Sequence, residues 1–143
     1  MVAFIIATHG EFSREIIKSA EMIFGKQENV AFVTFSPGEG LEDLQTKYYK
    51  ALQELDGSNG TLFMVDLFGG SPYNAAALIA ADKEEMDVIA GVNLPMLIEG
   101  FDKRQRNDFH DLIQSVSQTA ADGVKSFKQS LAYSNASEEN DLL

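Results

Sequence analysis

The sequence of 143 residues contains no cysteine and only two histidines. Without cysteine, the protein can form neither a disulfide framework nor a reactive thiol. No apolar run approaches the ~20 residues that span a bilayer. The first apolar run stops at His9 and has no basic residues before it, unlike a signal peptide. We therefore expect a cytoplasmic protein without direct membrane insertion.

Positive charge is also scarce, because 22 acidic residues outnumber 11 lysines and arginines and give a net charge of -11. This balance argues against binding nucleic acid or an anionic membrane through charge, and it favours a neutral or basic protein partner. The length and the hydrophobic content of 45% predict one domain with a full core. We expect this domain over residues 1–130, followed by a polar, acidic and disordered tail over residues 131–143.

Several motifs for binding cofactors are missing. Gly25-Lys26 is not a phosphate-binding loop, because the required upstream glycine is replaced by Ala20. No G-x-G-x-x-G follows a predicted strand, and neither metal-ligand spacing nor a G-x-S-x-G turn is present. We therefore expect no metal and no cofactor, and we expect any phosphate to arrive already activated on another protein.

Hydrophobic periodicity predicts strands that alternate with helices. Short apolar runs indicate strands over residues 2–8, 30–35, 62–65 and 86–90. Apolar residues at helical spacing indicate helices over residues 11–25, 41–55, 73–81 and 108–122, and a further helix that begins at residue 94. This order favours an α/β three-layer sandwich, with a four-stranded parallel sheet and helices on both faces. Residues 124–127 could form a short fifth strand or continue the last helix.

The central stretch runs from Phe63 to Ala75. Asp66 follows the third strand, Gly69-Gly70 makes a turn, and Ser71-Pro72 is typical of a helix start with Ser71 as N-cap and Pro72 at the first helical position. Such a turn directs backbone N–H groups and the positive end of a helix dipole into one cleft, which then binds anions. The first strand ends at Thr8-His9-Gly10. If the first and third strands are neighbours, His9 and Asp66 face each other at the carboxyl edge of the sheet.

A histidine beside a carboxylate at a helix N-terminus can accept a phosphoryl group. The carboxylate fixes the tautomer, and the other ring nitrogen attacks phosphorus. The candidate catalytic residues are therefore His9 and Asp66, although Asp66 could instead cap a helix or fix a loop. The candidate phosphoryl-binding residues are Thr8, Gly70, Ser71 and Pro72. Phe68 is either a core plug or part of a surface that docks a partner, and His110 is expected on the solvated side of its helix.

Four blocks of sequence carry a resemblance to a known family. They are Ala7-Thr8-His9-Gly10, residues 20–25, residues 65–76 and residues 89–97. In this order and spacing, the chain from Val2 to Phe127 resembles the enzyme IIA component of the mannose family of the bacterial phosphoenolpyruvate-dependent sugar phosphotransferase system.

The resemblance implies a mechanism and an assembly. The histidine phosphocarrier protein HPr would phosphorylate His9, and the group would pass to the IIB component, which works with the membrane components IIC and IID. Asp66 would bond the ring nitrogen that is not phosphorylated, and Ser71 and the helix start behind it would contact the phosphoryl group. The family fold has the first strand next to the third. It also has an antiparallel fifth strand exchanged between the subunits of a homodimer, which favours a strand over Val124–Phe127. The chain lacks an Ala/Pro-rich linker to a IIB domain and so resembles a free-standing IIA subunit.

Other functions remain open. One is a subunit of a phosphotransferase-driven dihydroxyacetone kinase, which shares the architecture. Another is a receiver-like signalling domain phosphorylated on Asp66, although that chemistry needs an acidic Mg²⁺ cluster which Ala7-Thr8-His9 does not supply. A third is a regulator whose phosphorylation state is sensed by other proteins, and this role could coexist with phosphoryl transfer.

Overall fold

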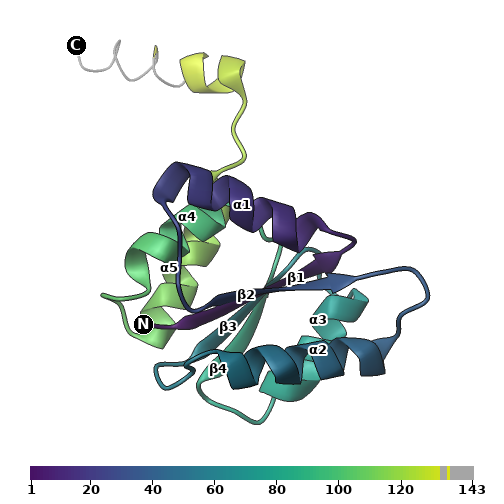
Figure 1. Ribbon diagram of the computed structural model, residues 1–143. Helices are drawn as coiled ribbons and strands as arrows, with labels where there is room; N and C mark the ends of the chain where they lie inside the picture. Colours follow the sequence, from purple (N-terminus) through teal and green to yellow (C-terminus); the bar gives the residue numbers. More distant parts are fainter. Residues whose placement is uncertain (133–134, 136–143) are drawn as a thin grey trace.

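The computed structural model describes residues 1–132 and residue 135, and it shows a parallel four-stranded sheet (Figure 1). The strands are β1 (Ala3–His9), β2 (Val30–Phe35), β3 (Thr61–Val65) and β4 (Met86–Ala90), in the order β2-β1-β3-β4. The predicted adjacency of the first and third strands is therefore confirmed. Their register places Ala7 opposite Val65, so the residues that follow each strand emerge side by side at the carboxyl edge of the sheet.

Helices cover both faces of the sheet, as the three-layer prediction required (Figure 1). The helices are α1 (Phe12–Phe24), α2 (Leu41–Glu54), α3 (Ser71–Ala80), α4 (Leu94–Lys103) and α5 (Phe109–Asp122). Successive side chains of a strand point to opposite faces, which divides the core in two. Phe4 and Ile6 of β1 pack with α1, α4 and α5, whereas Ile5 and Ala7 pack with α2 and α3. Within the described residues, no helix is both long and apolar enough to cross a membrane.

Arg104, directly after α4, is buried at the amino edge of the sheet. Its guanidinium lies over the rings of Phe4 and Phe101. It donates hydrogen bonds to the carbonyls of Val2, Glu28 and Asn29 and to the side chain of Gln27. Burial lowers the pKa of Arg104, and the nearby charge of Glu28 opposes that shift. The arginine thus ties the loop before β2 to the start of β1.

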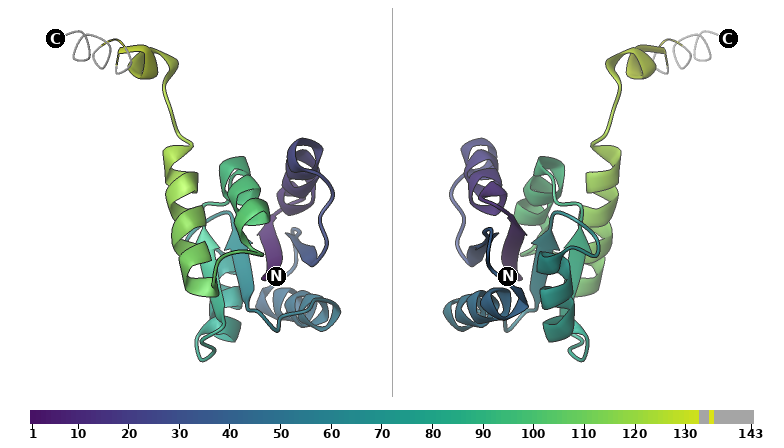
Figure 2. Two further views of the ribbon diagram at one scale, coloured as in Figure 1. Left: turned by 90° about the vertical axis from the view of Figure 1, so that its left-hand side faces the viewer. Right: turned by 90° about the vertical axis from the view of Figure 1, so that its right-hand side faces the viewer.

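The fifth strand expected over Val124–Phe127 does not form in the described part of this chain. Residues 124–126 are irregular, and residues 127–132 are helical. Figure 2 shows this segment leading away from the body of the domain, and the side chain of Val124 is 85% exposed. A strand satisfies its backbone groups by pairing with another strand, and none lies beside this segment. Of the tail predicted to be disordered over residues 131–143, only residues 131, 132 and 135 are described, as helix; the remaining residues lie outside the described part of the chain.

Candidate functional site

His9 and Asp66 meet at the carboxyl edge of the sheet, where β1 and β3 end side by side. The Nδ1 atom of His9 lies 2.9 Å from Oδ2 of Asp66, and the backbone N–H of His9 donates to the same oxygen at 3.0 Å. The other oxygen, Oδ1, accepts a hydrogen bond from the backbone N–H of Leu67 at 3.0 Å. The carboxylate is thus held by three donors, and its side chain is only 16% exposed.

This contact decides the tautomer of His9. An ionised carboxylate can only accept hydrogen bonds, so Nδ1 carries the proton that lies between the two side chains. In the neutral imidazole, Nε2 then has the free lone pair. The His9 side chain is 46% exposed. The site therefore presents a nucleophilic nitrogen to a reactant that approaches from solvent.

Two neighbours restrict the position of the His9 ring. The ring of Phe35, at the end of β2, meets it edge-on with centroids 5.7 Å apart. On Gly70, a Cβ atom would come within 3.1 Å of Cε1 of His9. Gly70 has no Cβ, so the backbone at the start of α3 can approach the imidazole closely.

The start of α3 differs by one residue from the prediction. Gly70, and not Ser71, is the N-cap, and its carbonyl accepts the first helical hydrogen bond from the N–H of Asn74 at 2.9 Å. The predicted N-cap role of Ser71 is therefore wrong, and Pro72 stands at the second helical position. The reason lies in the two-glycine turn: Gly69 has a φ of 79°, and Gly70 then takes the extended cap conformation. Among the described residues no side chain caps this helix, so the hydroxyl of Ser71 is not used for capping.

Thr8 and Pro72, predicted to bind the phosphoryl group, are both buried. The hydroxyl of Thr8 accepts a hydrogen bond from the N–H of Ser13 at 2.7 Å and donates to the carbonyl of His9 at 3.1 Å. The carbonyl of Pro72 accepts a hydrogen bond from the hydroxyl of Tyr48 at 2.7 Å. In this conformation both residues make their hydrogen bonds inside the fold.

Tyr48, on α2, is a residue of this region that the sequence did not single out. It is fully buried, and its ring meets Phe63 edge-on at 5.2 Å. Burial raises the pKa of Tyr48 well above its usual range, and the negative charge of Asp66 acts in the same direction. A signal was present in the sequence, because a tyrosine on a buried stripe needs a hydrogen-bond partner for its hydroxyl.

Exposed apolar side chains lie on the elements next to His9. Phe68 is 80% exposed and packs against Tyr73, with ring centroids 4.8 Å apart. Phe68 is therefore not a core plug. Leu67, beside it, and Phe12, at the start of α1, are also exposed. His110 is exposed on α5, as predicted.

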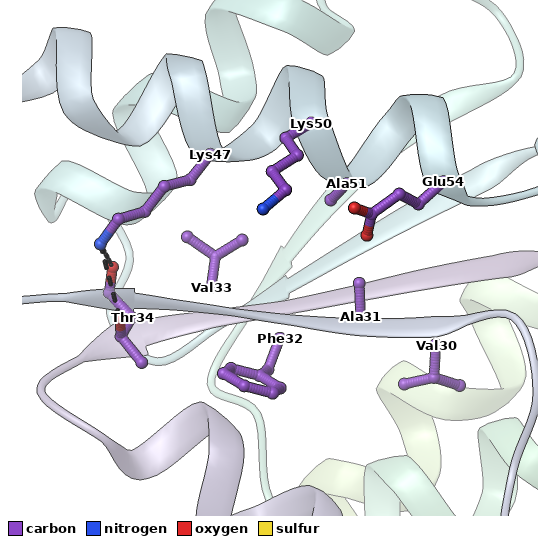
Figure 3. Close-up of a pocket in the computed structure, with 9 residues that line it drawn as sticks. All are labelled: Val30, Ala31, Phe32, Val33, Thr34, Lys47, Lys50, Ala51 and Glu54. Atoms are coloured by element: carbon purple, nitrogen blue, oxygen red, sulfur yellow. Dashed lines mark hydrogen bonds between the residues drawn. The ribbon is translucent and has the colours of Figure 1, made fainter.

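A hollow of about 430 Å³ lies between the outer edge of β2 and α2 (Figure 3). Figure 3 shows Lys50 and Glu54 of α2 directed toward β2, and Lys47 bonded to Thr34. Neither His9 nor Asp66 lines this hollow. It is therefore separate from the histidine site at the carboxyl edge.

The chain matches a known protein family. The sequence profile of the family EIIA-man, described as "PTS system fructose IIA component", matches residues 3–117. The chain is 46% identical over 128 residues to the mannose-specific EIIAB component of Escherichia coli K12, covering 89% of this chain and 40% of that protein. It is 43% identical over 116 residues to the fructose-specific EIIA component of Bacillus subtilis 168, covering 81% of this chain and 80% of that protein.

A solved structure shows the same fold. The mannose/sorbose-specific IIA subunit from Enterococcus faecalis superposes with a TM-score of 0.80 at 28% identity, covering 88% of this chain and 94% of that one. The chain therefore belongs to the enzyme IIA family of the mannose, fructose and sorbose class of the phosphotransferase system (PTS). It spans 40% of the length of the E. coli mannose-specific relative, which carries IIA and IIB together.

Proposed function

We propose that this chain carries phosphoryl groups on Nε2 of His9. In this proposal it accepts the group from phosphorylated HPr in the cytoplasm and delivers it to a IIB component, which works with the membrane components IIC and IID. The observation that carries the proposal is the contact of 2.9 Å between Nδ1 of His9 and Asp66, because it leaves Nε2 as the free nucleophile of a half-exposed ring.

The transfer step needs no cofactor. The lone pair of Nε2 attacks the phosphorus atom on the donor histidine, a new N–P bond forms at His9, and the N–P bond of the donor breaks. The electron pair of the broken bond returns to the donor ring. His9 keeps its proton on Nδ1 and becomes a phosphorylated imidazolium, whose positive charge faces the carboxylate of Asp66. Transfer to the IIB component is the same exchange, with His9 now as the donor.

The start of α3 is the proposed binding site for the phosphoryl oxygens. The first N–H groups of a helix have no partner within the helix, and the helix dipole favours an anion at this end. Pro72 has no N–H group, so the donors are the N–H groups of Ser71 and Tyr73 and the hydroxyl of Ser71. The close approach of Gly70 to His9 supports this assignment. We expect these donors to offset the repulsion between the phosphoryl oxygens and Asp66.

We further propose two protein interfaces. The exposed Phe68 belongs to the surface that receives HPr and the IIB component, since the partner's histidine must reach Nε2.

The second interface joins two subunits. Residues 1–130 form the carrier domain, and Val124–Phe127 forms a strand only when it is exchanged between two subunits of a homodimer. The exposure of Val124 and Phe127 in the single chain supports this second interface.

Phosphorylation by phosphoenolpyruvate, enzyme I and HPr tests the proposed function. We expect one label that survives alkali and is lost in acid. His9→Ala should abolish it, and His110→Ala, which removes the other histidine, should leave it unchanged. Ser71→Ala should slow transfer only modestly, and an unchanged rate would remove the hydroxyl from the site. A label that is lost in both acid and alkali and abolished by Asp66→Asn would instead indicate an acyl phosphate of a receiver-like domain.

A further inference from the structure

Tyr48 connects α2 to the first turn of α3. Its side chain is fully buried, and its hydroxyl donates a hydrogen bond to the carbonyl of Pro72 at 2.7 Å. Tyr48 and Pro72 are 24 residues apart in sequence. The contact is therefore tertiary and sets where α3 begins relative to α2.

The carbonyl of Pro72 would have a hydrogen-bond donor within the helix even without Tyr48. Pro72 stands at the second position of α3, where a carbonyl accepts a hydrogen bond from the residue four positions later in the helix. The tyrosine adds a second donor to the same oxygen, which has two lone pairs. A tyrosine hydroxyl is protonated at neutral pH in any case, and burial raises the pKa of Tyr48 further, so the hydroxyl remains a donor.

Pro72 also lies close in the chain to Gly70, which approaches the reacting ring of His9. Pro72 follows Ser71 and Gly70 directly, and a Cβ on Gly70 would come within 3.1 Å of Cε1 of His9. A shift of the first turn of α3 would therefore move Gly70 against the imidazole. It would also move the donors that we assign to the phosphoryl oxygens.

We infer that Tyr48 is a positioning residue for phosphoryl transfer, which holds the first turn of α3 against the His9 ring through its hydrogen bond to Pro72. This inference rests on the proposed function. Tyr48 does not contact the reacting atoms and acts through Pro72, Ser71 and Gly70.

Tyr48→Phe removes only the hydroxyl and keeps the ring packed on Phe63. We expect the rate of transfer from phosphorylated HPr at saturating donor to fall about tenfold, since small displacements at a reacting centre cost large factors in rate. The HPr concentration for half-maximal rate should not change, because Tyr48 is buried away from the docking surface. Tyr49→Phe, which removes the exposed hydroxyl next along α2, should transfer at the wild-type rate.

Two further variants separate positioning from a general loss of stability. Ile17→Val removes a buried methylene from α1, on the other face of the sheet, and should destabilise the fold without slowing transfer. Tyr48→Phe combined with Ser71→Ala should lose less rate than the product of the two single losses, because both changes act on the same turn.

The outcomes distinguish the inference from the function on which it rests. If the wild-type chain takes no label on His9, the proposed function fails and the inference fails with it. If the wild type is labelled and Tyr48→Phe transfers within twofold of its rate, only the inference is overturned. A slow Tyr48→Phe whose loss multiplies fully with that of Ser71→Ala would also overturn it, because the two residues would then act independently.

Discussion

Replacing Asp66 by asparagine tests the chemistry of the site most directly. The carboxylate accepts hydrogen bonds from Nδ1 and the backbone N–H of His9 through one oxygen, and from the N–H of Leu67 through the other. An amide has one oxygen and one NH₂ group, so it cannot accept at both ends. Whichever way it turns, one N–H group of the site meets another donor.

The expected magnitude follows from these contacts. A hydrogen bond to a charged group contributes about 1.5–3 kcal/mol, and this bond stabilises the phosphorylated imidazolium more than the neutral ring. At about 1.4 kcal/mol per factor of ten, its loss slows transfer roughly 10- to 150-fold. If the NH₂ group turns toward His9, the proton moves to Nε2 and the nucleophile is lost, so the effect grows toward the 10⁴-fold loss seen for a wrong histidine tautomer. The unpaired donor should also lower the free energy of unfolding by about 1–3 kcal/mol.

The assay is single-turnover transfer of labelled phosphate from HPr, with urea denaturation on the same preparations. Asp102→Asn is the matched control, since Asp102 pairs with Arg106 on the surface of α4; we expect it to transfer at the wild-type rate. If Asp66→Asn transfers within threefold of the wild type, the carboxylate neither sets the tautomer nor stabilises the phosphorylated ring, and the argument from geometry is refuted.

Three further predictions concern the surroundings of the site and the core. Gly70→Ala places a methyl group 3.1 Å from the His9 ring and should slow single-turnover transfer about 3- to 10-fold, with little change in the urea midpoint; an unaffected rate would show that the ring moves freely. Tyr48 has a raised pKa because it is buried, so above pH ~10 the unfolded chain loses the phenolic proton first, and the free energy of unfolding should fall by about 1.4 kcal/mol per pH unit. Urea denaturation at pH 9–11 should show this fall in the wild type and a smaller one in Tyr48→Phe, and equal slopes would contradict the burial argument. Arg104→Met removes the hydrogen bonds that the buried guanidinium donates to the carbonyls of Val2, Glu28 and Asn29 and should lower the free energy of unfolding by about 3 kcal/mol, while the folded fraction still accepts phosphate at the wild-type rate.

The helices and strands followed from the sequence because burial of apolar side chains is encoded locally. The predicted strand over residues 30–35 and the predicted helix over residues 108–122 agree with β2 and α5 to within one residue. The end of β1 at His9 and the position of Asp66 after β3 also came from short apolar runs that stop at a polar residue. These features depend on side-chain spacing over a few residues, which a sequence displays directly.

The failures concern backbone geometry and distant contacts. Serine is a residue type typical of an N-cap, but with the turn at Gly69 the helix begins one residue earlier and Gly70 is the N-cap. Thr8 stands beside His9 in the sequence, and only the structure shows that its hydroxyl bonds the N–H of Ser13 and the carbonyl of His9; its contact with the phosphoryl group stays a prediction. The predicted fifth strand over Val124–Phe127 has the composition of a strand but no neighbour with which to pair in the single chain.

By itself, the sequence determined an α/β sandwich with a histidine and an aspartate at strand ends and a glycine turn before a helix. Periodicity left the strand order open, and the adjacency of β1 and β3 was expected only from the family resemblance. The tertiary structure has this adjacency, which brings Nδ1 of His9 to 2.9 Å from an aspartate 57 residues away. It also decided that Tyr48 supports the first turn of α3. The physical reason is that hydrophobic periodicity specifies which face of an element is buried, whereas strand order and helix packing specify what that face meets.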